Sequence, residues 1–131
     1  MNALCPRTEY LSQVLPNGCM QNEKIELVRF DFDSDKLSAV AKTILDRLAK
    51  VIANYQDNTF LVQGHTDSLG DRWYNYDLSL RRAKAVKEYL VSAGVKKSQL
   101  RLKGEGESRP EVSNRDEAGR AINRRAVLVL D

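Results

Sequence analysis

Two residues of opposite charge, Asp67 and Arg82, stand where an expected strand gives way to the helix that follows it. Asp67 lies in residues 64–70, which read Gly-His-Thr-Asp-Ser-Leu-Gly. At ~100° of rotation per helical residue, Arg82 falls on the same apolar side as Leu78 and Val86. A desolvated guanidinium without a partner is costly, so Arg82 needs an acceptor or a ligand.

This pair of charges supports two interpretations. In the first, Asp67 is the nearest candidate partner in sequence and forms a salt bridge with Arg82 that fastens the loop to the helix. In the second, the two side chains hold a zwitterion, with the carboxylate facing an ammonium and the guanidinium facing a carboxylate. The two are compatible, because an ion pair in the empty domain can part when a ligand enters.

Hydrophobic periodicity predicts the elements that must position these side chains. Four runs are expected to be strands: 25–32, 58–65, 99–103 and 125–130. Two longer runs repeat at three and four residues and are expected to be helices: 37–54 and 75–93. Residues 104–119 are expected to be a long loop with a turn of helix near Asp116. The order βαβαββ predicts an α+β fold, a two-layer sandwich with both helices on one face of a mixed sheet.

The same patterns name residues expected on the core side of each element. On the strands these are Val28, Phe30, Phe32, Phe60 and Val62. On the first helix they are Val40, Ala41, Ile44, Leu48 and Ile52. Gly94 is expected in the left-handed C′ position that ends the second helix.

Length and composition are those of an ordinary globular domain. The 131 residues suffice for one domain with a two-layer core, and 42% are hydrophobic and 30% charged. The net charge of +3, from 21 basic and 18 acidic residues, does not require a nucleic acid as partner. No apolar run approaches the ~20 residues of a membrane-spanning helix.

Other chemistries find weaker support in the residue types. His65 is the only histidine and has no second histidine or cysteine pair nearby to complete a zinc site, so no metal is expected. A serine hydrolase would need Ser68 or Ser79 as nucleophile and His65 as base. The sequence around them does not resemble a nucleophile elbow, and no third residue stands out to orient the histidine. Glu105 and Glu107 suggest a glycosidase pair, but a solvated glycine-rich turn accounts for them better. No enzymatic activity is expected.

Three residues near these motifs remain open to more than one interpretation. Trp73 and Tyr74 follow the Asp67 loop and either stack on sugar rings or cover the helix start, of which the cover is favoured. Asn123 either belongs to a solvated strand entrance or supports the ligand loop from below. Neither alternative for Asn123 is preferred.

Four motifs in order resemble one known family. Residues 65–70 read His-Thr-Asp-x-x-Gly, and residues 75–86 continue as Asn-x-x-Leu-Ser-x-x-Arg-Ala-x-x-Val. Residues 30–34 read Phe-Asp-Phe-Asp-Ser, residues 104–110 Gly-Glu-Gly-Glu-Ser-Arg-Pro, and residues 123–125 Asn-Arg-Arg. Together they resemble the OmpA-like peptidoglycan-binding domain of outer-membrane porins, the peptidoglycan-associated lipoprotein and the stator protein MotB. The resemblance covers roughly residues 25–131.

The resemblance implies a non-catalytic domain that binds the peptide stem of peptidoglycan through meso-diaminopimelate, without a cofactor. By position, the family's ligand-pairing aspartate falls on Asp67 and its carboxylate-binding arginine on Arg82. The other contacts implied are Phe32, Asp33, Asn75 and Leu78. Two positions depart from the family: Asp71 replaces a small or threonine-like residue, and Ala126 replaces valine.

The resemblance also divides the chain into a linker arm, residues 1–22, and the binding domain, residues 23–131. In the arm, Cys5 and Cys19 resemble the linker that ends a thrombospondin type 3-like segment in some porins, which implies a disulfide but no bound calcium. It would close a loop of about 15 residues, worth about 3 kcal/mol in the chain-entropy model. Two free thiols in a flexible tail are the alternative.

A family member must reach the periplasm, yet the first residues lack the features of a signal peptide. The chain is therefore expected to begin partway through a longer outer-membrane or envelope protein, with membrane association only through a missing N-terminal region. The alternative function is a protein–protein module, such as a homodimer, with a degenerate wall site. Asp71 and the bulky Trp73 and Tyr74 are the residues that favour this alternative.

Overall fold

The computed structural model describes residues 24–54, 57–108 and 110–130. The arm of residues 1–22 and its two cysteines lie outside the described residues, so the disulfide and the domain boundary stay predictions. The elements in chain order are β1 Lys24–Arg29, α1 Ala39–Ala53, β2 Phe60–Gly64, α2 Arg72–Ser92, a short 3-10 helix Lys97–Gln99, β3 Leu100–Gly104, α3 Glu117–Asn123 and β4 Arg125–Leu130.

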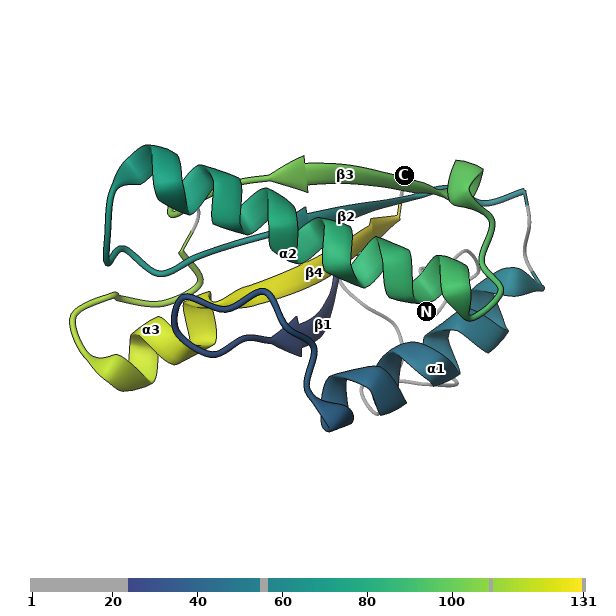
Figure 1. Cartoon of the computed structure of the whole chain (residues 1–131), viewed down its shortest axis with the longest axis horizontal. Helices are drawn as coiled ribbons and strands as arrows, with labels where there is room; N and C mark the ends of the chain where they lie inside the picture. Colours follow the sequence, from purple (N-terminus) through teal and green to yellow (C-terminus); the bar gives the residue numbers. More distant parts are fainter. Residues whose placement is uncertain (1–23, 55–56, 109, 131) are drawn as a thin grey trace, which may run out of the picture.

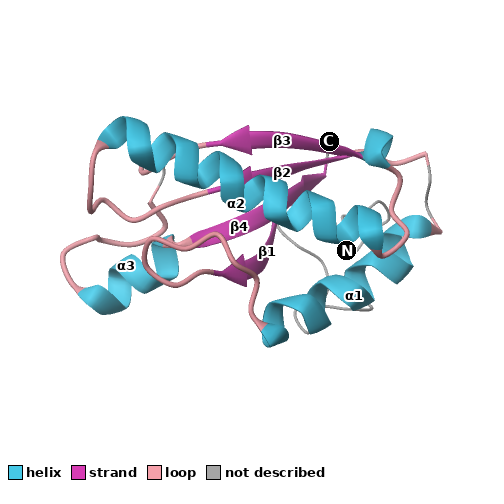
Figure 2. Ribbon diagram, in the orientation of Figure 1, coloured by secondary structure: helices cyan, strands magenta, loops and turns pink. Residues whose placement is uncertain are grey.

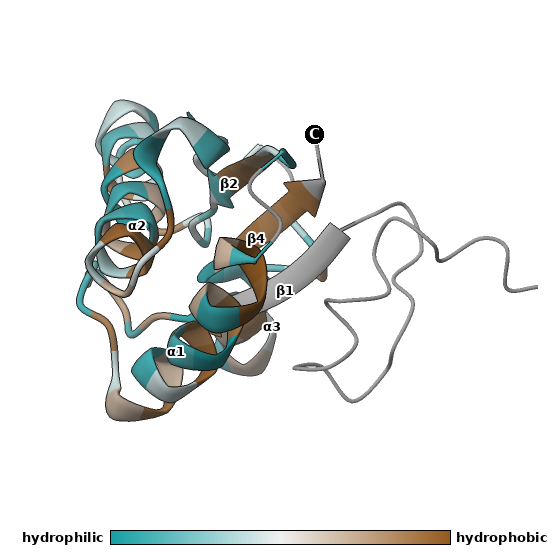
Figure 3. Cartoon of the chain, turned by 90° about the vertical axis from the view of Figure 1, so that its right-hand side faces the viewer, coloured by the Kyte–Doolittle hydropathy of each residue, from teal (hydrophilic) through white to brown (hydrophobic). Residues whose placement is uncertain are grey.

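The four strands form one mixed sheet in the order β1-β4-β2-β3 (Figure 1). β4 runs antiparallel to both β1 and β2, whereas β2 and β3 are parallel. Seen after a 90° turn, α1 and α2 lie on one side of this sheet (Figure 3). The expected α+β sandwich, with two main helices on one face of a mixed sheet, is confirmed.

The core lies between these two helices and the sheet. Its fully buried members include Leu45, Leu48 and Ile52 of α1, Val86 and Leu90 of α2, and Phe60, Val62 and Leu128 of the strands. Val40 is an exception to the predicted set, because its side chain is 71% exposed. The arc of α1 that faces the sheet runs through Ala41, and Val40 lies outside this arc, ~100° around the helix from Ala41.

Two elements differ by three residues from a predicted bound. β1 ends at Arg29, before Phe32, and the chain then turns through Asp33, whose φ of 55° lies in the left-handed region. α2 begins at Arg72 rather than residue 75, because the Asp71 carboxylate caps it by accepting from the amides of Trp73 and Tyr74 at 3.0 and 3.2 Å.

The turn of helix expected near Asp116 is a seven-residue helix, α3, with Asp116 as its N-cap. Gly94 has the positive φ expected after α2. Figure 2 shows that the loops after β1 and β2, the start of α2, and α3 gather at one end of the sheet. The predicted site residues come from this end.

α2 lies unusually close to the sheet at two glycines. A Cβ atom at Gly64 of β2 would stand 1.8 Å from the carbonyl oxygen of Ser79. A Cβ atom at Gly104 of β3 would stand 2.7 Å from Oγ of Ser79 and 3.0 Å from the amide nitrogen of Leu80. Any larger residue at these positions would push the helix off the sheet.

The close approach at Gly64 leads to a stability prediction. We expect Gly64→Ala to lower the free energy of unfolding by about 3 kcal/mol, at the upper end for overpacking, because the new methyl group meets main chain. Gly94→Ala is the control, since Gly94 has open space around it and only its positive φ penalises a side chain, by about 1–2 kcal/mol. Urea denaturation measures both; equal losses would contradict the packing argument.

The N-cap at Asp71 leads to a second stability prediction. We expect Asp71→Ala to lower the free energy of unfolding by about 1 kcal/mol, because two amides of the first turn of α2 lose their acceptor. Asp71→Ser should retain most of the stability, since serine is a comparable N-cap. Thermal unfolding of the three proteins measures this. A loss in the serine variant as large as in the alanine variant would mean that Asp71 acts by something other than capping.

Candidate ligand-binding site

The six side chains proposed from the sequence as a ligand site line one hollow of about 180 Å³. They are Phe32, Asp33, Asp67, Asn75, Leu78 and Arg82. Thr66, Leu69, Gly70 and Tyr74 complete the wall. Three segments supply these residues: the loop after β1, the loop after β2 and the first turns of α2. The structure thus brings the whole predicted set together at one end of the sheet.

Arg82 lines this hollow and is fully buried. Its guanidinium donates three hydrogen bonds to main-chain carbonyl oxygens: Nε to Ser34 at 2.8 Å, Nη1 to His65 at 2.9 Å and Nη2 to Asp31 at 3.0 Å. The guanidinium carbon also lies 5.1 Å from the centroid of the Phe30 ring. One arginine of α2 therefore ties together the loops that follow β1 and β2.

The charge of Arg82 has no carboxylate at hydrogen-bond distance among the described residues. A guanidinium has five N–H groups, so three bonds leave one N–H on each terminal nitrogen for a further acceptor. Burial lowers the pKa of Arg82 from its ordinary value to about 10, an effect that the nearby charge of Asp67 opposes. A buried cation bonded only to neutral carbonyls is a site that favours an anion.

Asp67 pairs with a different arginine from the one considered in the sequence analysis. Its Oδ2 accepts from Nη1 of Arg124 at 3.1 Å, and its Oδ1 accepts from the amide of Leu69 at 3.0 Å. The salt bridge between Asp67 and Arg82 considered from the sequence is therefore not formed. The partner instead comes from the residue before β4, 57 positions along the chain.

Arg124 is a positioning residue that sequence reasoning missed. Besides Asp67, it donates from Nη2 to Glu117 of α3 at 2.8 Å and from Nε to the carbonyl of Phe30 at 3.0 Å. Hydrogen bonds to Glu117 and then to Asp67 raise the pKa of Arg124 above its ordinary value. The Asn-Arg-Arg motif was the available signal, but nothing local in the sequence links it to Asp67.

Asn75 holds the Asp67 loop in shape. Its Nδ2 donates to the carbonyl of Leu69 at 3.0 Å and to Oε1 of Glu107 at 2.8 Å, and lies 3.4 Å from the carbonyl of Asp67. The side chain is buried. Asn75 thus links the loop after β2 to the segment after β3.

The rim of the hollow is formed by the turn after β1 and by Tyr74. The phenol of Tyr74 donates to the carboxylate of Asp33, and Phe32 beside it is 59% exposed. Within the described part of the chain, the amides of Phe32 and Asp33 donate to no protein group. Tyr74 is therefore a wall of the hollow rather than a cover for the helix start.

Trp73 is 72% exposed, so most of its surface is not packed against the helix start. Asn123 follows neither of its two interpretations. Its Oδ1 accepts from the amides of Glu111 and Val112 at 2.8 and 3.1 Å, so it braces the segment before α3 rather than the Asp67 loop. His65 contributes its main-chain carbonyl to Arg82.

Two further findings concern the chain as far as it is described. No group of three or more His, Cys, Asp or Glu side chains in these residues is arranged to hold a metal ion. None of the helices found there combines the length and the apolar character needed to cross a membrane.

The part of the chain that carries the site is similar to known proteins. The model of the OmpA family matches residues 29–124. Outer membrane porin F of Pseudomonas aeruginosa is 40% identical over 126 residues, which are 92% of this chain and 36% of the porin. The peptidoglycan-associated lipoprotein of Rhizobium meliloti is 41% identical over 101 residues, 77% of this chain and 57% of that protein. The chain spans about a third of the length of the porin F relatives it matches.

A solved structure agrees with the sequence matches. The peptidoglycan-associated lipoprotein from Burkholderia pseudomallei has a TM-score of 0.78 and 33% identity, and the match covers 88% of this chain and 96% of that one. The C-terminal domain of Helicobacter pylori MotB, at 24% identity and a TM-score of 0.74, shares the fold. The expectation of a non-catalytic domain agrees with this family. The chain belongs to the OmpA family.

Proposed function

We propose that this domain binds peptidoglycan without a covalent bond and anchors an outer-membrane or envelope protein to the cell wall. Its relatives support the partner, because they include peptidoglycan-associated lipoproteins and outer membrane porins. They also support a periplasmic location for the domain. The finer part of the proposal, that meso-diaminopimelate of the peptide stem is the group held, depends on the chemistry of the hollow.

The buried guanidinium of Arg82 carries this proposal. It is fully buried and bonded only to carbonyl oxygens, yet two of its N–H groups are unused within the described residues. A ligand carboxylate supplies both the missing negative charge and acceptors for those groups. Arg82 therefore grips the free carboxylate of the diaminopimelate side chain.

Asp67 and the turn after β1 complete the capture of a zwitterion. Each oxygen of Asp67 accepts one protein hydrogen bond, which leaves lone pairs for the ligand ammonium. Arg124 fixes the carboxylate in place, since it is anchored on Glu117 and on the main chain of Phe30. The unpartnered amides of Phe32 and Asp33 hold the neighbouring carboxylate.

This arrangement explains selectivity between stem peptides. A lysine in the same position keeps the ammonium but lacks the carboxylate that Arg82 requires. Binding lysine would leave the buried charge of Arg82 unpaired, at a cost of ~1–3 kcal/mol or more. Diaminopimelate satisfies both partners at once.

A protein–protein module with a degenerate wall site is the second candidate. Exposed apolar side chains at this end of the sheet favour it: Phe32, Leu69, Trp73, Tyr74 and Tyr76 are each more than two-fifths exposed. Asp71 no longer favours it, since its charge caps α2. Analytical sedimentation with and without a muropeptide distinguishes the two candidate functions. A dimer whose formation does not change when the muropeptide is added would support the second candidate.

The role of Arg82 is tested by calorimetric titration with a meso-diaminopimelate stem peptide and its lysine counterpart. We expect Arg82→Lys to weaken diaminopimelate binding at least tenfold, about 1.4 kcal/mol, because an ammonium cannot offer two parallel N–H groups. Arg81→Lys is the matched control, because Arg81 pairs with Asp35 and Asp77 and does not line the hollow.

Two safeguards make this test decisive. Arg82 also supports two loops, so the urea midpoint of each variant must show that the domain is folded at the titration temperature. A folded Arg82→Lys protein with unchanged affinity would overturn the mechanism. Binding of neither peptide by the unaltered domain would overturn the proposed ligand.

The role of Asp67 is tested by changing the ligand and the residue together. We expect acetylation of the side-chain ammonium of diaminopimelate to weaken binding to the unaltered domain about tenfold or more. In Asp67→Asn the same acetylation should change affinity far less, because the carboxylate that pairs with the ammonium is gone. Fluorescence anisotropy with labelled peptides measures the four affinities. Equal effects of acetylation in both proteins would mean that the ammonium does not contact Asp67.

A further inference from the structure

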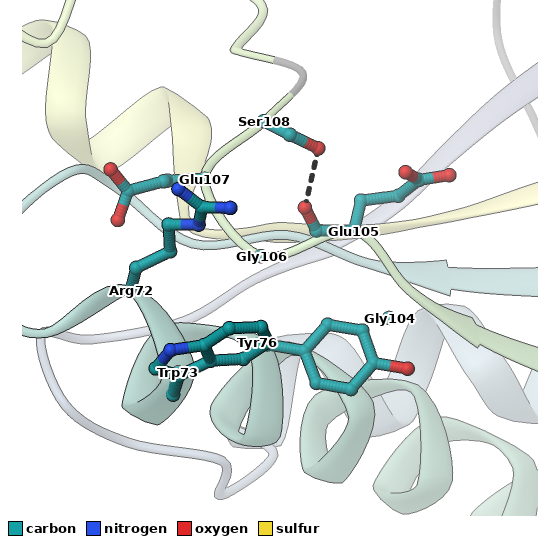
Figure 4. A pocket seen from close by; sticks show the side chains of 8 residues that line it. All are labelled: Arg72, Trp73, Tyr76, Gly104, Glu105, Gly106, Glu107 and Ser108. Atoms are coloured by element: carbon teal, nitrogen blue, oxygen red, sulfur yellow. Dashed lines mark hydrogen bonds between the residues drawn. The ribbon is translucent and has the colours of Figure 1, made fainter.

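A second and larger hollow, of about 520 Å³, lies between the first turns of α2 and the segment that follows β3 (Figure 4). Its walls are Arg72, Trp73 and Tyr76 from the first turns of α2 and the segment 104–108 that ends β3 and follows it. It contains none of the six proposed peptide contacts. We refer to it as the aromatic groove.

Two aromatic side chains give this groove its character. Trp73 is 72% exposed and Tyr76 is 48% exposed, and they stand three residues apart on one face of α2. Figure 4 shows both rings on the side of α2 that faces residues 104–108. Paired exposed rings beside a hollow offer a flat apolar platform whose π faces attract the polarised C–H groups of a ligand.

The charges around the platform nearly cancel, which argues against an ionic ligand. The guanidinium of Arg72 already lies 5.6 Å from the centre of the Trp73 ring, so a second cation would be repelled there. The carboxylate of Glu105 is 8% exposed and pairs with Lys103 at 3.4 Å. The carboxylate of Glu107 accepts from Asn75. The groove therefore suits a neutral ligand with an apolar face and polar edges.

We propose that the aromatic groove binds a pyranose ring of the amino-sugar strand that carries the peptide stem. The C–H face of the sugar stacks on Trp73 and Tyr76. Its hydroxyl and acetamido groups bond to the guanidinium of Arg72, the carboxylate of Glu107 and the hydroxyl of Ser108 at the groove edge. This inference rests on the proposed function only in that sugar and peptide belong to one ligand.

The groove is preformed, and one hydrogen bond links its wall to the wall of the peptide site. The amide of Gly106 donates to Oγ of the buried Ser79 at 2.9 Å, which fixes the segment after β3 against α2. The same segment presents Glu107 to Asn75, and Asn75 lines the peptide hollow. Two residues in direct contact therefore line the two hollows, and the inference places the peptide of one ligand in the first and its sugar in the second.

The experiment uses the 131-residue chain and three ligands: the stem peptide alone, a trimer of N-acetylglucosamine alone, and a disaccharide muropeptide with the same stem. We expect the muropeptide to bind at least fivefold more tightly than the peptide. Trp73→Ala should abolish this advantage while leaving the affinity for the peptide alone unchanged. Trp73→Phe should keep part of the advantage, because the platform remains.

Fluorescence provides a direct reading, because Trp73 is the only tryptophan of the chain. The sugar trimer alone should shift the emission of Trp73, and Tyr76→Ala should weaken this response. Val40→Ala is the control for removal of an exposed apolar side chain far from the groove, since Val40 is 71% exposed on α1. It should alter neither reading.

The outcomes separate this inference from the proposed function. Equal affinity for peptide and muropeptide, with no response of Trp73 to the sugar, overturns the inference and leaves peptide binding intact. A response to the sugar without any binding of the peptide supports the groove and overturns the proposed peptide site.

Discussion

The buried guanidinium of Arg82 is the interaction on which the ligand end of this domain depends. It joins α2 to the carbonyls of Asp31, Ser34 and His65, so one side chain sets the relative position of two loops. Those loops carry Asp67 and the turn after β1. The cation that organises the site is thus also a group without a carboxylate partner among the described residues, and structure and ligand recognition depend on the same atoms.

The position of Arg82 depends in turn on how closely α2 lies on the sheet. Gly64 and Gly104 let the main chain and hydroxyl of Ser79 approach the strands, and Arg82 follows Ser79 by one turn of helix. Ser79 also accepts from Gly106, so the segment that forms one wall of the aromatic groove is fixed by the same contact. Small residues on two adjacent strands therefore determine the geometry of both hollows.

Local pattern predicted the fold well because each element packs one face against the core. It failed where the backbone conformation of a residue, rather than the polarity of its side chain, determines where an element begins or ends. Phe32 continues the alternation of β1, but Asp33 adopts a positive φ and turns the chain out of the sheet. The start of α2 was placed three residues late, because Asp71 was read as an added charge near the ligand instead of as an N-cap. Val40 repeats at helical spacing yet lies outside the arc that faces the sheet.

The site was predicted as a set of residues but not as a set of contacts. Sequence proximity suggested Asp67 for Arg82, whereas the fold brings Arg124 to Asp67 from 57 positions away. That exchange of partners changes the electrostatics of the hollow. Asp67 and Glu117 are both bonded to Arg124, so of these two arginines it is Arg82 whose charge has no bonded carboxylate among the described residues. Carboxylate capture by Arg82 therefore supplies the larger electrostatic gain, and the ammonium contact at Asp67, where Arg124 already competes, mainly adds selectivity for a zwitterion.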